Sequence, residues 1–154
     1  MPLPHLFGTT LSGLSRQYPA DLPETPVALV FGFAHEARHD VARWKRELEA
    51  RGLPYLSLPS TVDDVPAPAL LGIAEAMKAH VPPEAWDRIV QIHRGAGALL
   101  EALGWRRDLH AKVLVTQRRG DALASHGSGP FSEAAFGLIA HALTRHTSNP
   151  SREA

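Results

Sequence analysis

The run from Val27 to Ala34 constrains the fold of this chain more than any other stretch. Its sequence, VALVFGFA, consists of small, β-branched and aromatic residues and carries no charge. Such a run is typical of a strand that is buried on both faces, as in the middle of a parallel sheet. The apolar period then changes, because Val41, Trp44 and Leu48 predict an amphipathic helix that packs on the strand and ends at Gly52. The stretch therefore predicts an α/β fold built around one central strand.

The turn between this strand and this helix, residues 35–40, has the sequence HEARHD. It is the densest group of ionisable side chains in the chain. In open α/β sheets, ligands gather at the carboxyl ends of strands, so functional residues are expected here. The candidate binding residues of the turn are His35, Glu36, Arg38 and His39.

The other segments alternate between strand and helix patterns. Strands are expected over 53–58 and 86–93, helices over 69–80, 95–104 and 132–146, and hairpins near 6–13 and over 112–126. Alternation of this kind implies a sheet that contains parallel strands and has helices on both faces. We expect Met77 and Trp44 to lie in the core, one domain over residues 1–146, and a flexible C-terminal tail over 147–154.

Composition excludes several function classes. The 154 residues contain no cysteine, which excludes disulfides, thiolate catalysis and thiolate metal sites within this sequence. Lys and Arg balance Asp and Glu at 16 each, so no electrostatic footprint for nucleic acid or anionic membrane is present. No apolar run approaches the ~20 residues that cross a bilayer. We expect a soluble, cytoplasmic protein with no membrane span and no nucleic-acid partner.

One motif in the turn suggests a different chemistry. His35-Glu-Ala-Arg-His39 matches HExxH, in which two histidines on one helix face bind zinc and the glutamate acts as general base. Three features oppose this interpretation: the residues just upstream are strand-like, Arg38 and Asp40 bring charges into the motif, and no third-ligand motif follows. A zinc-dependent hydrolase using His35, Glu36 and His39 is kept as an alternative hypothesis.

Several weak motifs, taken in order, resemble one known family. They are Gly8-Thr-Thr-Leu-Ser-Gly13, the early helix residue Trp44, Met77-Lys-Ala-His-Val-Pro-Pro83, Arg88-Ile-Val-Gln-Ile-His93, and the strand, Arg-Gly turn, Gly-Ser-Gly and helix of 113–143. The order of strands and helices resembles the thioredoxin-like superfamily over about residues 5–146, and the motifs point to one branch of it. Within it, the chain is similar to a cysteine-poor branch that includes the mitochondrial ATP synthase assembly factor and bacterial relatives.

The resemblance implies where the redox residues of the superfamily have been lost. In peroxiredoxins and membrane-tethered thioredoxins, an apolar strand ending in Phe-x-Ala precedes a Cys-x-x-Cys helix start. Placed on residues 29–34, that pair of cysteines falls on Ala37 and Asp40, and the cis-proline of the family falls on His110 or Ala111. Both redox landmarks of the superfamily are therefore absent.

The resemblance also implies a fold, a site and a function. The fold is a three-layer α/β/α arrangement with a central mixed sheet and a C-terminal β-hairpin plus helix. The loop before that hairpin brings Asp108 and His110 across a groove from His35, Glu36 and His39, as a relic of the thiol site. The expected function is a redox-inactive module that binds a protein partner or assists assembly, without a cofactor. A small-anion binder that uses Arg38 at the positive end of the helix is a further alternative.

Overall fold

The computed structural model describes residues 3–61 and 65–147. Its strands are β1 (Leu6–Thr10), β2 (Ser15–Tyr18), β3 (Val27–Gly32), β4 (Tyr55–Pro59), β5 (Val90–Arg94), β6 (Lys112–Thr116) and β7 (Ala124–His126). Its helices are α1 (Arg38–Ala50), α2 (Ala67–Lys78), α3 (Ala96–Leu103) and α4 (Glu133–Thr147), with the 3-10 helices η1 (His35–Ala37) and η2 (Pro83–Arg88).

The strands form two hydrogen-bonded sheets that continue into each other. One has the order β2-β1-β5 and the other β4-β3-β6-β7. Parallel bridges from Ser57 to Ile89 and from Ser60 to Ile92 join β4 to β5. β3 pairs in parallel with β4 and antiparallel with β6, and β6 pairs antiparallel with β7. The result is a mixed sheet with β3 near its centre, as the uncharged run predicts.

β3 separates two hydrophobic cores because successive side chains of a strand point to opposite faces. Ala28 and Val30 belong to the core that also holds Trp44 of α1 and the apolar stripe of α4. Leu29 and Phe31 belong to the core that holds α3 and the N-terminal hairpin. These four residues of β3 are at most 1% exposed, and burial stabilises the fold by about 1.5–3 kcal/mol for each of the larger side chains, Leu29, Val30 and Phe31.

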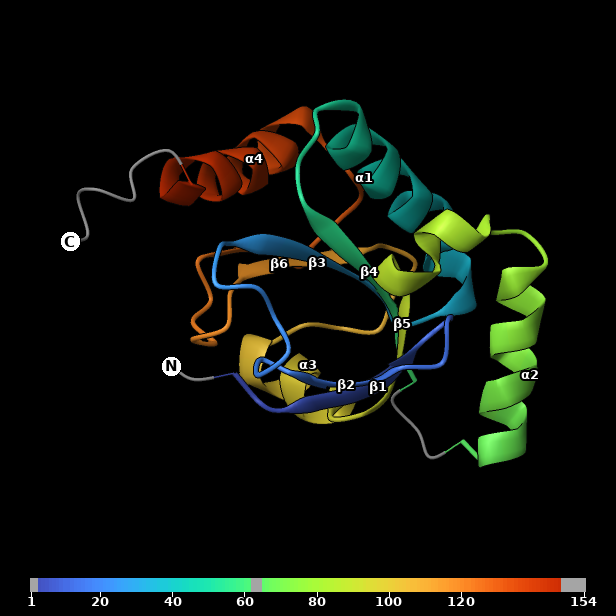
Figure 1. The fold of residues 1–154 in the computed structure, drawn as a ribbon. Coiled ribbons are helices and arrows are strands. Elements are labelled where there is room, and N and C mark those ends of the chain that lie inside the picture. The colour runs from blue at the N-terminus through green and yellow to red at the C-terminus, as the bar shows by residue number, and fades with distance from the viewer. Residues whose placement is uncertain (1–2, 62–64, 148–154) are drawn as a thin grey trace.

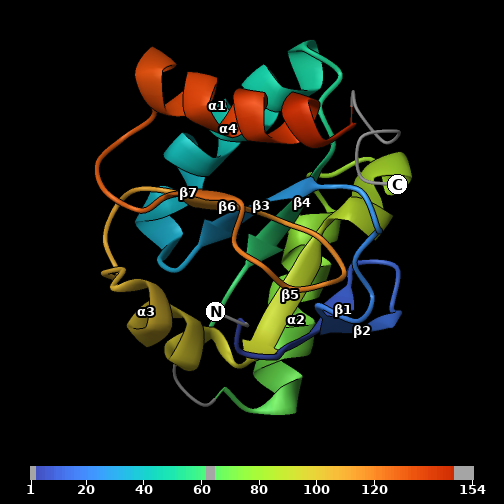
Figure 2. The same cartoon turned by 90° about the vertical axis from the view of Figure 1, so that its left-hand side faces the viewer.

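The helices complete three layers. α1 and α4 cover one face of the sheet and α3 lies on the other, as Figures 1 and 2 show from two directions. Ser132 caps α4 by accepting a hydrogen bond from the N–H of Ala135 at 3.1 Å, as expected. Trp44 is 0% exposed, so its predicted core position is confirmed. The expected fold class, an α/β/α arrangement with a mixed sheet and a closing hairpin and helix, is confirmed.

Two local predictions are wrong. The expected strand over 86–93 starts only at Val90, because η2 occupies Pro83–Arg88 and the indole N–H of Trp86 donates to the carbonyl of Val81 at 2.9 Å. α2 has no buried residue, and Met77 is only half-buried, so it does not lie in the core. α4 runs through Thr147, and the rest of the expected tail, 148–154, lies outside the described residues.

Candidate functional site

The turn after β3 is a short 3-10 helix followed directly by α1. Ala34 is extended, with φ −142° and ψ 151°, and the N–H of Ala37 donates to the carbonyl of Ala34 at 3.0 Å. The guanidinium of Arg38 donates to the carbonyl of His35 at 3.1 Å. The chain therefore leaves the sheet through one tight turn before the α-helical hydrogen bonds begin.

This geometry does not support the zinc hypothesis. The HExxH motif needs both histidines on one face of one helix. His35 lies in η1 and His39 in α1, and both side chains are exposed, as is Glu36. Across residues 3–61 and 65–147, no group of three or more His, Asp or Glu side chains is placed to hold a metal ion. The motif in the sequence thus has no matching arrangement in the described structure.

Asp40 has a role that the sequence does not reveal. One oxygen of its carboxylate accepts the N–H of Ala111 at 2.8 Å, and the other accepts the N–H of Phe131 at 2.9 Å. The side chain thereby joins α1, the loop before β6 and the loop before α4. Ala37, which the resemblance aligns with the first cysteine of the pair, is 0% exposed. The two positions at which the resemblance expects the cysteine pair thus hold a buried methyl group and a carboxylate bound by two backbone N–H groups.

The loop before β6 carries a second polar cluster. Asp108 accepts hydrogen bonds from the backbone N–H of His110 and from the ammonium of Lys112, both at 2.9 Å. Lys112 is 0% exposed and also donates to the carbonyl of Gly127 at 3.0 Å. Partial burial raises the pKa of Asp108, but the hydrogen bonds from Lys112 and His110 outweigh it and hold that pKa below its usual value.

The loop before β6 and the start of α1 are joined by a hydrogen bond. The loop with Asp108 and His110 touches the start of α1 at the Asp40–Ala111 hydrogen bond. Within the described residues, no hydrogen bond or ion pair links His35, Glu36 or His39 to Asp108 or His110. The binding role of these side chains, and that of Arg38, stays a prediction.

Lys112 is the residue of this region that the sequence analysis missed. Its strand, KVLVT, is buried at every position. A lysine at the start of such a strand, four residues after an aspartate, is the signal that could have predicted a buried pair. Asp40 gave no comparable signal, because its partners are backbone groups of distant segments.

Aromatic rings close the site from the side of α4. The Trp44 ring lies 5.1 Å from that of Phe131, edge to face, and 5.3 Å from that of His126. The guanidinium of Arg43 lies 4.4 Å from the centre of the Phe131 ring, a cation–π contact. These contacts pack the loop before α4, from which the N–H of Phe131 reaches Asp40.

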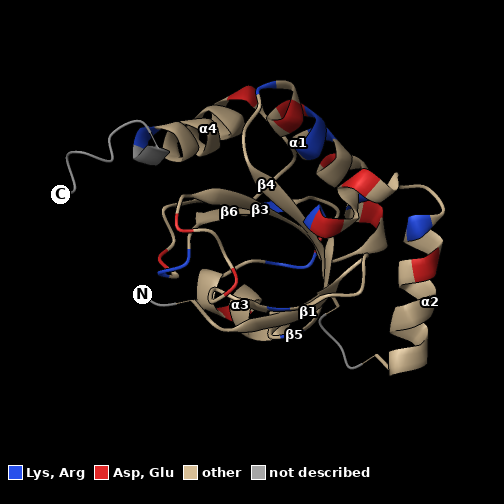
Figure 3. Cartoon of the chain, viewed as in Figure 1, with Lys and Arg blue, Asp and Glu red and all other residues tan. Residues whose placement is uncertain are grey.

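Charged side chains are spread unevenly over the helices. Figure 3 shows acidic and basic residues mixed along α1, whereas most of α2 carries none. On α2 the side chains of Leu71 and Ile73 are 65% and 44% exposed. Among the described residues, no helix is long and apolar enough to cross a membrane.

Solved structures with this arrangement show which fold it is. A putative electron transfer protein from Aquifex aeolicus VF5 has a TM-score of 0.61 at 13% identity, over 97% of this chain and 94% of that chain. BsSco, a member of the Sco family of cytochrome c oxidase assembly proteins, has a TM-score of 0.60 at 12% identity, over 93% and 94%. The exposed lipoprotein thioredoxin Etrx1 of Streptococcus pneumoniae TIGR4 has 0.57 at 15%, over 92% and 98%.

The chain has a thioredoxin-like fold. The three neighbours span nearly its whole length, and their low identities carry the likeness no further than the fold. No protein-family model and no curated protein matches this sequence.

Proposed function

We propose that this chain is a redox-inactive protein of thioredoxin-like fold that binds another protein through α2 and acts in assembly. Thiol chemistry has no reactive group here, because the 154 residues contain no cysteine. The place of the second lost cysteine is taken by Asp40, whose two oxygens are both engaged by backbone N–H groups. An assembly role is supported by the resemblance to the ATP synthase assembly factor branch and by the Sco family name of one structural neighbour.

The observation that carries the binding proposal is the exposure of α2. None of its residues is buried, although its first two turns, APALLGIA, are wholly uncharged. Monomeric soluble proteins rarely leave large contiguous apolar patches in water, and patches of that kind mark interaction sites. In Figure 1 the helix stands at one side of the sheet, outside the two covering layers. A helix in this position is available to a partner without any change in the core.

The chemistry of the exposed side chains of α2 selects the kind of partner. Leu71 and Ile73 offer branched aliphatic side chains, and the charged residues of α2, Glu75 and Lys78, are paired with each other at 3.2 Å near its C-terminal end. Such a surface has no net charge to attract nucleic acid or anionic lipid. Leu71 and Ile73 are two residues apart and therefore point to different sides of α2. The surface fits an apolar groove on another protein that encloses the helix.

The binding proposal is tested by site-specific crosslinking. A photoreactive amino acid placed at Leu71 is expected to give one discrete crosslinked protein in the source cells. The same substitution at Glu101, an exposed residue of α3, serves as the control and should give none. The double variant Leu71→Lys, Ile73→Lys should also weaken binding of the isolated partner, by about tenfold or more, because two buried aliphatic groups are lost. Equal crosslinking at both positions would refute a role for α2.

The redox half of the proposal is tested separately. In an insulin reduction assay with dithiothreitol as electron donor, the protein should add nothing to the background rate. Insulin reduction above that background would contradict the redox-inactive half of the proposal. If the protein is inactive in this assay and also gives no crosslink at α2, the proposed binding function is refuted and only the absence of redox activity stands.

A further inference from the structure

The three lysines of this chain lie in different surroundings. The ammonium of Lys78 is 3.2 Å from Glu75, and that of Lys112 is fully buried and 2.9 Å from Asp108. Lys45, on α1, has neither a hydrogen bond nor an ion pair with any residue in the described part of the chain. Its amine is therefore the one lysine nitrogen here that is held by no acceptor within those residues.

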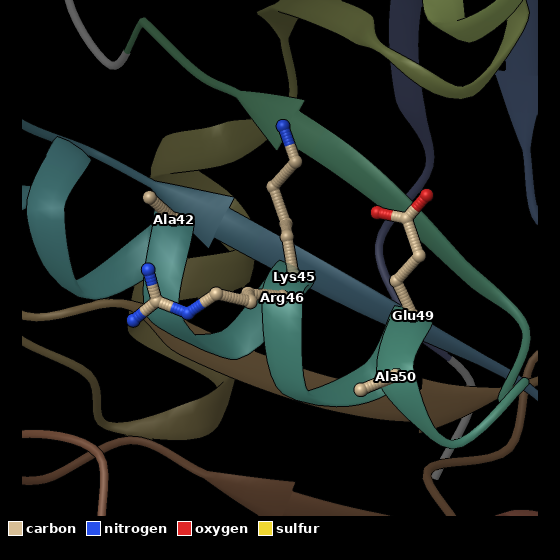
Figure 4. Close-up of a pocket in the computed structure, with 5 residues that line it drawn as sticks. All are labelled: Ala42, Lys45, Arg46, Glu49 and Ala50. Atoms are coloured by element: carbon tan, nitrogen blue, oxygen red, sulfur yellow. The ribbon is translucent and has the colours of Figure 1, made fainter.

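Lys45 borders an open hollow on the outer surface of α1. The hollow has a volume of about 460 Å³ and is lined by Ala42, Lys45, Arg46, Glu49 and Ala50. Ala42 and Ala50 fill little of the space beside the longer side chains. Figure 4 shows Lys45 and Glu49 extending to the same side of the helix, while Arg46 extends away from them. A small molecule can therefore reach the Lys45 amine from solvent.

The groups around Lys45 disfavour its charged form. Half-burial is the largest effect and lowers the pKa of Lys45, Glu49 raises it, and Arg88 of η2 lowers it. The net shift is downward. Glu49 is also shared, because it accepts a hydrogen bond from Tyr55 at 3.3 Å and lies 4.0 Å from Arg88. A larger fraction of the amine is therefore neutral, and so nucleophilic, than for an ordinary surface lysine.

We propose that Lys45 is a modification site that accepts an acyl group from an acyl phosphate. The lone pair of Nζ attacks the carbonyl carbon of the donor and forms a C–N bond. The bond between the carbonyl carbon and the bridging oxygen of the acyl phosphate breaks, phosphate leaves with the electron pair, and the proton of the amine passes to water. Nothing is oxidised or reduced. The product is a neutral amide, which relieves the repulsion between a half-buried ammonium and Arg88. Arg46 supplies a cation at the rim for an anionic donor.

This site does not depend on the proposed partner surface, because the hollow lies on α1 and the partner surface on α2. The experiment incubates the full chain with acetyl phosphate at pH 7.5 and follows each lysine by peptide mass spectrometry. Lys45 should be acetylated severalfold faster than Lys78, because burial lowers the pKa of Lys45 and its amine has no acceptor among the described residues, whereas the ammonium of Lys78 is paired with Glu75. Lys78 in the same molecule is the internal reference.

Two variants test whether the fast acetylation of Lys45 comes from its surroundings or only from its lack of an ion pair. Arg88→Gln should slow acetylation of Lys45, because it removes a cation and frees Glu49. Glu75→Gln releases Lys78 from its partner and should leave Lys45 the faster site. Equal rates at Lys45 and Lys78 in the unmodified chain, or an unchanged rate at Lys45 in Arg88→Gln, would overturn the proposal.

Discussion

The carboxylate of Asp40 and the N–H of Ala111, 71 residues apart in the chain, are joined by a hydrogen bond of 2.8 Å. A proline at position 111 could not make this bond, because proline has no N–H. If the alignment with the redox pattern holds, the two departures fit each other: an aspartate accepts at the position expected for a cysteine, and an alanine donates at one of the two positions expected for the cis-proline. The same carboxylate also accepts the N–H of Phe131.

Asp40→Ala is expected to destabilise the protein by about 1–3 kcal/mol, because two backbone N–H groups in a half-buried site lose their acceptor. Asp40→Asn should cost less, since one amide oxygen can still accept one of the two bonds. Urea unfolding measures both. Glu36→Ala, in the same turn but exposed, is the control and should stay within about 0.5 kcal/mol. Equal stability of all three variants would show that the hydrogen bonds of Asp40 do not stabilise the fold.

We expect the stability of the protein to depend on pH in the acid range because of the ion pair between Asp108 and Lys112. The pKa of Asp108 is lowered in the folded protein, with burial opposing and the bonds from Lys112 and His110 outweighing it. A lowered folded-state pKa means that the carboxylate contributes stability above the unfolded value, near 4, and loses it as the pH falls through the folded value. The Asp108→Asn variant lacks this group, so its unfolding midpoint should fall less steeply than that of the original chain below about pH 4.

Urea midpoints between pH 3 and 6 measure this difference. Glu101→Gln removes an exposed carboxylate of α3 and serves as the control. Parallel curves for the original chain and Asp108→Asn over this range would show that the Lys112 pair does not contribute to acid stability.

The parts of the fold that follow local patterns could be predicted from the sequence. β3 is an uncharged run, α1 has an apolar stripe through Trp44 and Leu48, and the hairpin of β6 and β7 surrounds a Gly-Asp turn. The layers follow from the alternation of strands and helices. Each of these signals lies within about fifteen residues, so it needs no knowledge of the rest of the chain.

The parts that depend on distant partners could not be predicted. α2 has the apolar content of a core helix, but whether a helix is covered depends on what else packs in the fold, and here it stands in water. Asp40 looks like one more charge in a polar turn until the N–H groups of Ala111 and Phe131 are in place. Sequence spacing suggested zinc at His35 and His39. His35 lies in the 3-10 helix η1 and His39 in α1, so the single α-helix that this spacing assumes is not formed.

Gly127 is expected to tolerate no side chain. A Cβ at this position would lie 1.9 Å from Nε1 of Trp105, so the indole or the loop must move. Gly127→Ala should therefore destabilise the protein by about 1–3 kcal/mol, as overpacking does. Gly137→Ala in α4 is the matched control: nothing lies within 4 Å of its added Cβ, and alanine favours a helix over glycine by about 0.5–1 kcal/mol. Thermal unfolding of the two variants should shift in opposite directions.

Zinc is expected to leave the melting temperature of this protein unchanged. His35 and His39 belong to different helices, both are exposed, and the described residues hold no third ligand beside them. A ligand stabilises a protein only by binding its folded state, so a site with two loosely placed imidazoles should give no shift at zinc concentrations equal to that of the protein. The measurement is a thermal scan with and without zinc, on the original chain and on His39→Ala. Replacing His39 should itself cost less than about 1 kcal/mol, because its side chain is in solvent. A zinc-dependent rise in the original chain that is absent in His39→Ala would establish a metal site at this turn and return the hydrolase hypothesis to consideration.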